Sequence, residues 1–397
     1  MTTGRQNLRQ VRTRVRRPAA ASPSPLFSMR SQKKSSEPVV RTFQPQALRD
    51  FCRDLLTSVG TPVAHARLVS HSLVEANLRG VDSHGIQMLM MYITQQRAGG
   101  MDVANSGRVQ SRRGACLLYN GQNGLGQVVA NRCVEHAIRL ARRFGLSLVV
   151  ANNSNHLGAC AYWGQKMTRA GFIGIVMTNG CPAAAPWQGR TPIFGTNPLC
   201  MAVPGAGPDS WLLDMATTTV ALGKLGNAAF LNQPTIPLAW GFLDAKANPT
   251  TSTDAAVLGV NGVPLPTPTG GYKGTGLAMM VEILCAGLSG GAMATDLPVF
   301  RTGGDPIGIS HMFLAIDPRR FLPLPRFRSR MGRLAKIVKA SKPARGYREV
   351  LVAGDPEYRA ERQRRRNGIP IPTKLWALLT ALAAELGVVP PKPGLRR

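Results

Sequence analysis

The tetrapeptide Asp82-Ser83-His84-Gly85 has the residue types of a proton-transfer site. It lies where one predicted helix has ended and the next begins, so the first amides of the second helix can bind an anion. The positive end of that helix favours neutral His84, and a neutral imidazole accepts the proton of an alcohol. Ser83 would orient the ring or bind the substrate oxygen. Taken alone, the segment keeps a simpler interpretation, in which Ser83 caps a helix and His84 is a surface residue.

A second histidine, His156, follows an apolar strand predicted over 146–151 and precedes a predicted helix. The carboxyl end of a strand is the usual edge of an active site in an α/β protein. Polar, turn-forming residues surround His156 in the stretch 152–158, which argues against a core position. An ordinary loop is the alternative interpretation.

Three other loops combine glycine with polar side chains that a core does not need. They are Gly195-Thr196-Asn197-Pro198, Asp214-Met215-Ala216-Thr217 and Gly270-Gly271-Tyr272-Lys273-Gly274. In the last of them, the glycines would let the backbone approach a phosphate while Lys273 supplies positive charge. Turns use the same residue types, so an ordinary turn is the alternative for each loop.

A glycine-rich turn, Gly121-x-x-Gly124-x-Gly126, invites a dinucleotide interpretation that its spacing does not support. The Rossmann fingerprint is G-x-G-x-x-G, with an acidic residue at the end of the next strand. Here the next strand ends in Asn152-Asn153. We interpret the turn as a tight bend with close helix packing, and we predict no Rossmann domain.

The seven cysteines are scattered and include no C-x-x-C pair, which argues against a disulfide framework and against a structural zinc site. We therefore predict no metal site and expect reduced thiols in a cytosol-like compartment. Cys181 and Cys200 lie near the polar loops, but neither has a clear base partner for nucleophilic catalysis.

Two hydrophobic patterns in the sequence predict the helices and strands that position these residues. Apolar residues at three- and four-residue steps predict helices over 45–59, 62–79 and from Asp82 or Ser83 to about Arg97. From Cys116 onward, short apolar strands alternate with helices, which is typical of an α/β fold. We expect strands over 116–119, 146–151, 173–178, 211–214 and 312–316. We expect helices ending at residue 144, over 162–170, over 274–288 as a buried helix, and over 375–386.

Taken together and in this order, the segments resemble the malate/L-lactate dehydrogenase family. That family includes ureidoglycolate and sulfolactate dehydrogenases and the Δ1-piperideine-2-carboxylate reductases, and it differs from the Rossmann-type lactate dehydrogenases. The matching stretches are LRGVDSHG, NNSNHLG, FGTNP, LLDMATTTVALGKL, GGYKGTGLAMMVEIL, FLAIDPRRF and GDPEYRAERQRRRNGIP. They extend from about residue 43 to about residue 390. Such an ordered set is specific for the family but not for a substrate.

The resemblance implies an α/β fold with a family-specific, non-Rossmann NAD(P)-binding sheet domain and a helical domain built from N- and C-terminal segments. It also implies an obligate homodimer with active sites near the subunit interface. We therefore expect a disordered basic arm or targeting segment over 1–40, an N-terminal helical segment over 41–115, an α/β cofactor- and substrate-binding domain over 116–318, and a basic C-terminal helical segment over 319–397 that packs on the N-terminal helices.

The resemblance also implies roles for single residues. Ser83 and His84 match the family's catalytic Ser–His pair, and His156 matches a histidine with the acid/base role in some members, so both histidines are candidates. Tyr92 matches a substrate-side tyrosine, and Thr196 falls in the loop near the substrate. The residues that match cofactor-contacting segments are Asp214, Met215, Ala216, Gly270, Gly271, Asp355, Pro356 and Glu357.

Two positions depart from the family pattern. Many members carry an arginine four residues after the first histidine, where it grips a carboxylate through two hydrogen bonds; here Met88 stands there. The carboxylate then needs another cation, and Lys273 or Arg190 are the candidates. The reductase branch has an aspartate where this chain reads Gly223-Lys224-Leu225, which favours the malate/lactate-like side of the family.

The formal charge of +29 comes mainly from the two ends of the chain. Residues 1–36 hold nine Lys or Arg and no acid, and residues 319–366 hold sixteen against four acids, whereas residues 50–318 hold 18 against 14. Such a surplus of basic residues suggests nucleic-acid binding as the alternative function. Its terminal location, the 6% aromatic content and the lack of a nucleic-acid-binding motif argue against specific binding.

The sequence therefore predicts a dehydrogenase that transfers a hydride between NAD or NADP and a small 2-hydroxy or 2-oxo acid, malate- or lactate-like. A catalytically impaired family member and a basic nucleic-acid-binding protein are the alternatives. We expect a homodimer with no membrane span, in the cytoplasm or, if residues 1–36 are a targeting segment, in an organelle.

Overall fold

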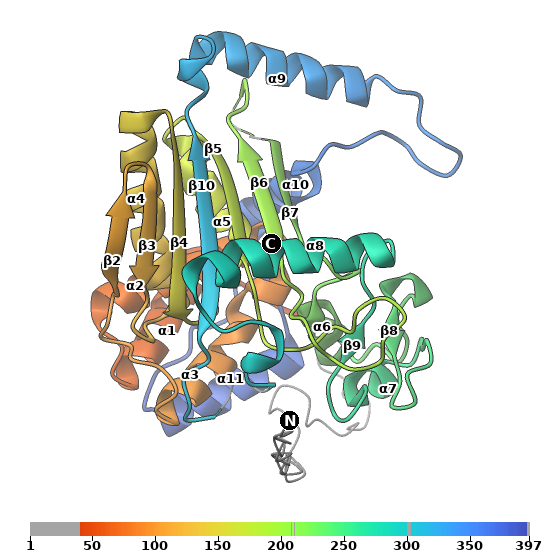
Figure 1. Cartoon of the computed structure of the whole chain (residues 1–397). Coiled ribbons are helices and arrows are strands. Elements are labelled where there is room, and N and C mark those ends of the chain that lie inside the picture. The colour runs from red at the N-terminus through yellow and green to blue at the C-terminus, as the bar shows by residue number, and fades with distance from the viewer. Residues whose placement is uncertain (1–39, 208, 210, 300–302, 395–397) are drawn as a thin grey trace, which may run out of the picture.

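The computed structural model describes residues 40–207, 209, 211–299 and 303–394 (Figure 1). The basic arm predicted over 1–40 lies outside these residues except for Val40, which begins the first strand. Among the described helices, none is long and apolar enough to cross a membrane.

A seven-stranded mixed sheet forms the centre of the molecule (Figure 1). Its strands are β2 (Arg108–Arg113), β3 (Cys116–Asn120), β4 (Leu146–Ser154), β5 (Ile173–Thr178), β6 (Leu199–Val203), β7 (Trp211–Met215) and β10 (Ile309–Ile316). The spatial order is β2-β3-β4-β10-β5-β6-β7. The neighbours β3 and β4 are parallel, and all other neighbours in this sheet are antiparallel. Since β4 and β5 both run against β10, their carboxyl ends meet at one edge of the sheet.

One face of the sheet is covered by α4 (Gly126–Phe144) and α5 (Cys160–Arg169). Residues such as Val129, Cys133 and Trp163 pack there against Val149 and Phe313 of the strands. The α/β alternation from Cys116 onward is thus confirmed. The turn Gly121–Gly126 is a tight bend, because a Cβ on Gly126 would lie 2.1 Å from the Asn155 carbonyl oxygen.

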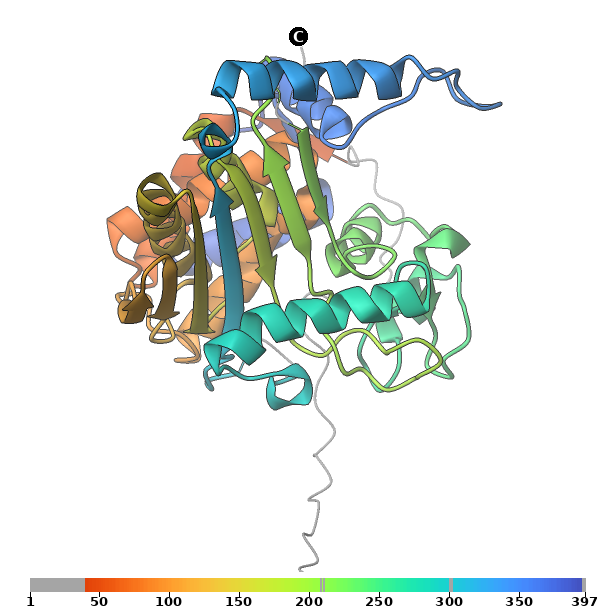
Figure 2. The same cartoon turned by 45° about the horizontal axis from the view of Figure 1, so that its top comes forward.

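The opposite face carries α8 (Tyr272–Glu282), which continues through a π turn over Ile283–Gly287. Both views place α8 across the front of the sheet (Figures 1 and 2). Val281 and Cys285 pack on the sheet, whereas Met279 and Ile283 on the other side of the helix are 50% and 58% exposed. The helix expected over 274–288 is present, but the expectation that it is buried holds for one side only, because only that side meets the sheet.

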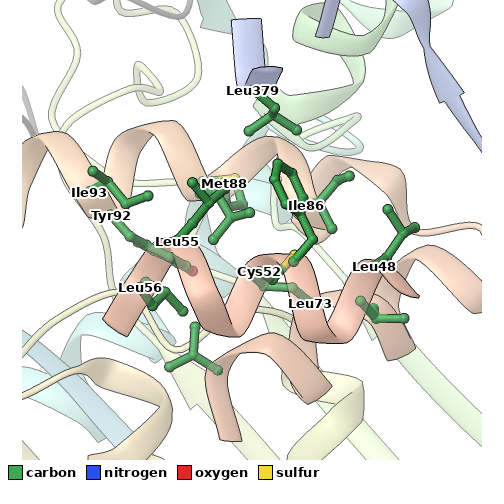
Figure 3. Packing of buried hydrophobic residues seen from close by; sticks show 14 of the residues in the cluster. Leu48, Cys52, Leu55, Leu56, Leu73, Ile86, Met88, Tyr92, Ile93 and Leu379 are labelled. Carbon is green, nitrogen blue, oxygen red and sulfur yellow. The ribbon is translucent and has the colours of Figure 1, made fainter. Parts of the chain in front are cut away.

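A layer of helices from both ends of the chain lies behind the face that α4 and α5 cover (Figure 1). Its members are α1 (Pro45–Ser58), α2 (Val63–Leu78), α3 (Leu89–Arg97) and α11 (Thr373–Glu385). The two ends are joined by antiparallel pairing of β1 (Val40–Phe43) with β11 (Ile369–Pro372), and the Trp376 ring centre lies 4.1 Å from that of Phe43. Figure 3 shows the apolar core that α1 to α3 and Leu379 share.

The remaining elements flank the sheet. A small unit beside the end of β7 contains α6 (Leu222–Phe230), β8 (Phe242–Leu243), α7 (Thr253–Leu258) and β9 (Leu265–Pro266). The basic helix α9 (Leu324–Lys339) has no buried residue and stands apart from the helical layer (Figures 1 and 2). Helix α10 (Asp355–Asn367) leads back to α2 and β11.

The third helix begins later than the sequence predicts. Asp82–His84 and Ile86–Met88 form two short 3₁₀ turns separated by Gly85, whose backbone is extended (ψ −152°), and α3 starts at Leu89. Neither Asp82 nor Ser83 caps a helix. The cause is tertiary, because a Cβ on Gly85 would lie 2.2 Å from the side-chain oxygen of Asn77 on α2.

Candidate functional site

Polar loops from several strands meet at one edge of the sheet. His156 follows the end of β4, Asn179 follows the end of β5, and Ala216 follows the end of β7. Thr196 precedes β6, which runs against both of its neighbours and so begins at the same edge. These loops, which the sequence leaves far apart, therefore surround one place.

The Ser83–His84 turn is held at this edge by Asp82. The Asp82 carboxylate accepts two hydrogen bonds from the Arg364 guanidinium of α10, at 2.6 and 2.9 Å, and a third from Asn77 Nδ2 at 2.6 Å. Asn77 Oδ1 in turn accepts the backbone N–H of Ile86 at 2.8 Å. A bidentate guanidinium–carboxylate pair fixes orientation as well as distance. Asp82 is thus a positioning residue rather than a helix cap.

The two candidate histidines face each other. Their ring centres lie 5.5 Å apart and the planes are inclined by 26°. His84 Nδ1 lies 2.9 Å from Ser83 Oγ, and His156 Nδ1 lies 2.7 Å from the Tyr92 hydroxyl. Tyr92 Oη also accepts a hydrogen bond from Gln127 Nε2 at 2.8 Å. Each imidazole is thus oriented through Nδ1 by a hydroxyl group.

Two polar anchors beneath these loops have no counterpart in the sequence-based expectations. His311 on β10 is fully buried between Thr178 Oγ1 and Ser154 Oγ, each 2.8 Å away, and burial lowers its pKa to about 3. Its neutral ring ties the ends of β4 and β5 together. On α8, the buried Glu282 carboxylate accepts hydrogen bonds from Asn179 Nδ2 (3.1 Å) and Asn197 Nδ2 (2.9 Å). From the sequence, His311 and Glu282 look like ordinary residues of a strand and a helix. Only their tertiary contacts reveal their role.

His84 lies where two adjoining hollows meet, and His156 lines the first of them; the pair is here called the two-histidine wall. The first, here called the apolar cavity, is lined by Ser83, His84, Gln87, Met88, Met91, His156, Gly158, Thr178, Asn179, Gly180, Cys181, Pro182, Ala183, Thr196, Pro198, Ala221, Leu222, Gly223, Gly226, Phe230, Gly262, Val263, Pro264 and Val299. The second, here called the groove, shares Ser83, His84, Thr196 and Ala221 with it and extends past Asp214 to Arg79 and Glu357. A reactive centre at the histidines would thus have the apolar cavity on one side and the groove with its charged residues on the other.

The groove holds an unusual buried cation. Arg79 is only 4% exposed, and in the described part of the chain its Nε, Nη1 and Nη2 have no hydrogen-bond partner. The guanidinium lies over the Tyr358 ring, with 4.6 Å to the ring centre, and Glu361 Oε2 is 3.5 Å from Nη1. Burying polar nitrogens without partners is costly. Arg79 is therefore suited to bind an anionic group that enters the groove.

Asp214 lies in the same groove at the end of β7. Its Oδ2 accepts the backbone N–H of Ala161 at 2.7 Å. Burial raises the pKa of Asp214 to about 6, and the nearby Glu357 carboxylate acts in the same direction, while the Ala161 hydrogen bond and Arg79 oppose it. The groove thus combines carboxylates with cations, as a site for a nucleotide's hydroxyl and phosphate groups requires.

The first turn of α6 adds backbone donors to the apolar cavity. Leu222 and Gly223 line the cavity, and within the described chain neither of their amides donates a hydrogen bond to a backbone carbonyl. A Cβ on Gly223 would lie 2.6 Å from the Ser83 Cβ, so glycine lets this helix end approach the Ser83–His84 turn. Free amides at a helix N-terminus favour an anion such as a carboxylate.

Most of the predicted site residues lie at these two hollows. Ser83, His84, His156 and Thr196 line the cavity, the groove contains Asp214, Met215, Ala216 and Glu357, and Tyr92 touches His156 from behind. Lys273, Arg190, Gly270, Gly271, Asp355 and Pro356 line neither hollow. Lys273 is exposed on the first turn of α8, and Asp355 binds Lys339 at 2.8 Å. Arg79 and Gln87 also line the hollows but were not predicted as site residues, since an arginine before a glycine and a glutamine in a helix are common.

No group of His, Cys, Asp and Glu side chains in the described residues is arranged to hold a metal ion.

Sequence comparisons agree with the residue-level resemblance. Residues 43–380 match the family model described as malate/L-lactate dehydrogenase. The chain is 35% identical over 344 residues to malate dehydrogenase from Pyrococcus horikoshii, covering 86% of this chain and 94% of that protein. It is also 35% identical over 269 residues to a (2R)-3-sulfolactate dehydrogenase (NADP(+)) from Chromohalobacter salexigens, covering 67% and 78%.

Solved structures agree as well. The Pyrococcus horikoshii malate dehydrogenase structure has a TM-score of 0.81 at 31% identity and covers 91% of this chain and 99% of its own. The Δ1-piperideine-2-carboxylate reductase from Pseudomonas syringae has a TM-score of 0.74 at 26% identity, with coverage of 86% and 100%. The chain therefore belongs to the malate/L-lactate dehydrogenase family and is an NAD(P)-dependent hydroxy acid dehydrogenase.

Proposed function

We propose that the enzyme interconverts a malate- or lactate-like 2-hydroxy acid and its 2-oxo acid at the two-histidine wall, where the apolar cavity adjoins the groove. The observation that carries the proposal is the pair of facing imidazoles, His84 and His156, each oriented through Nδ1 by a hydroxyl group. Bound NAD(P) supplies the hydride acceptor or donor.

We assign the proton transfer to His84. Gln127 donates to Tyr92 Oη, which directs the Tyr92 hydroxyl proton toward His156 Nδ1. In neutral His156 the ring proton is then on Nε2, so this ring donates a hydrogen bond to the substrate oxygen. To His84 we assign the tautomer in which Nδ1–H donates to Ser83 Oγ, 2.9 Å away, so that Nε2 is the basic nitrogen. His84 therefore takes the hydroxyl proton during oxidation and returns it during reduction.

The C1 carboxylate of the substrate is placed at the start of α6. The amides of Leu222 and Gly223 supply donors, and the adjoining Gln87 side chain is only 4% exposed. These groups would orient the C1 carboxylate through uncharged donors, so this role needs no arginine.

Substitution of either histidine tests the assignment. His84→Gln and His156→Gln should each lower kcat/KM for 2-oxo acid reduction by about 100-fold or more, which is the typical contribution of a positioned acid or base. The assay follows NADH and NADPH oxidation against a panel of 2-oxo acids. His136→Gln, on α4 and in neither hollow, is the matched control and should keep wild-type activity with the same circular dichroism spectrum. Full activity in both site variants would rule out the assignment.

We further propose that Arg79 binds the diphosphate of the cofactor, while Asp214 and Glu357 bind ribose hydroxyl groups. Arg79→Met keeps the apolar stem but removes the charge. It should raise the Kd for NADH or NADPH about tenfold, the effect of losing a hydrogen bond to a charged group. The measurement is a fluorescence titration without 2-oxo acid. Arg366→Met, an exposed position on α10, is the control. An unchanged Kd in a folded Arg79→Met protein would contradict the role.

We also propose a homodimer. The support is an exposed apolar strip on α8 and the residue after its π turn, where Met279, Ile283 and Leu288 are 50%, 58% and 51% exposed. Exposed apolar strips of this kind mark interfaces. Sedimentation velocity should give about twice the chain mass of 42.6 kDa, and Ile283→Glu should shift the mass toward the single chain. A wild-type monomer at micromolar concentration would refute the dimer.

For the cellular compartment we propose the cytoplasm. All seven cysteines are unpaired and six are buried, which suits a reducing environment.

A further inference from the structure

We propose that the substrate of this enzyme has an apolar side chain and a single carboxylate, so that the second anionic group of a dicarboxylate is excluded. The inference rests on the proposed function, because it takes the two-histidine wall as the place of reaction. It concerns the part of the apolar cavity that lies beyond the histidines.

The lining of the cavity carries almost no charge. Among its described residues there is no Asp, Glu, Lys or Arg, and the histidines at the wall are its only titratable side chains apart from Cys181. The polar residues lie at the strand ends and on the Ser83–Gln87 side. The larger apolar side chains of the lining include those of Met88, Met91, Phe230, Val263, Pro264 and Val299.

These apolar walls are fixed by the core. Met88, Met91 and Phe230 are only 9%, 5% and 2% exposed and belong to the cluster that joins the N-terminal helices to α11. Figure 3 shows Met88 among the side chains of that cluster, with Leu55 and Ile93 also labelled. This part of the wall is therefore apolar because its side chains also belong to the core.

Among the described residues, the cations that line the site lie in the groove. Arg79 and Lys224 line the groove and not the apolar cavity, and the Lys224 ammonium lies 5.6 Å from the centre of the Trp240 ring. The two cations that the sequence offers as substitutes for an arginine at Met88, namely Lys273 and Arg190, line neither hollow.

The two ends of a substrate would thus meet different surroundings. The C1 carboxylate has the amides of Leu222 and Gly223, whereas a carboxylate at the far end would lose its water without gaining a counter-ion or donors. An aliphatic group in the same place gains contact with the methionine and phenylalanine walls. Since one methylene in an apolar pocket changes specificity by about 10- to 200-fold, the discrimination should be large.

A matched pair of substrates tests the inference on the wild-type enzyme. 4-Methyl-2-oxopentanoate and oxaloacetate share the 2-oxo acid group and the next methylene, and they differ in an isopropyl group against a carboxylate of similar shape. With the preferred nicotinamide cofactor at saturation, kcat/KM for 4-methyl-2-oxopentanoate should exceed that for oxaloacetate at least about tenfold. Equal values or a preference for oxaloacetate would overturn the inference while leaving the proposed function intact. Failure to reduce either compound or pyruvate would overturn both.

A substitution at the cavity wall provides the second test. Met88→Arg adds a cation beside the substrate side chain and should move the kcat/KM ratio toward oxaloacetate by about tenfold or more. Met88→Leu changes the shape of the wall without adding charge, and should keep the wild-type preference. A ratio that moves equally in both variants would show that wall shape, rather than charge, sets the specificity, and would contradict the inference. If Met88→Arg does not fold, the comparison of the two substrates on the wild-type enzyme still tests the inference.

Discussion

The ion pair between Asp82 and Arg364 is the interaction on which the geometry of the site most depends. It joins residues 282 positions apart and holds the Ser83–His84 turn against both α2 and α10. The two side chains are 23% and 17% exposed, so the pair is partly shielded from water and fixes direction as well as distance. Pairing of β1 with β11 and the contact of Trp376 with Phe43 bring the C-terminal segment to this position. The turn that carries the proposed acid/base is thus built by both ends of the chain, whereas the sheet supplies the opposing His156.

The sheet edge and the helical layer together divide the site by polarity. Strand ends and the helix termini near them contribute Asn179, Thr196 and Asp214, which are polar because the loops there need turn-forming or hydrogen-bonding residues. The core of the helical layer contributes Met88 and Met91 together with Phe230 of α6, which packs into the same cluster. A buried guanidinium on one side of the histidines and an uncharged cavity on the other follow from this division. The same division explains how one site can hold a charged dinucleotide and a substrate with little charge of its own.

Local patterns were enough to predict much of this. The strand predicted over 173–178 coincides with β5, and both histidines stand next to glycine and polar residues at the ends of predicted elements. Contacts between distant segments could not be predicted in the same way. Arg364 stands in a run with Arg362, Arg365 and Arg366, and no local feature distinguishes the one that binds Asp82. The third helix was predicted to start too early because the contact of Gly85 with Asn77 is tertiary. The buried guanidinium of Arg79, whose nitrogens lack hydrogen-bond partners in the described chain, and the buried ring of His311 became evident only once the chain was folded.

Direct hydride transfer at the two-histidine wall is tested most directly by isotope tracing. The enzyme reduces a 2-oxo acid with cofactor that carries deuterium at the transferable C4 position, and the product is analysed by mass spectrometry and proton NMR. Transfer as proposed places deuterium at C2 of the 2-hydroxy acid, where no proton signal then remains, while the hydroxyl proton supplied through His84 exchanges with water. A product that contains only solvent hydrogen at C2, or no reduction of any 2-oxo acid, would contradict the proposed chemistry.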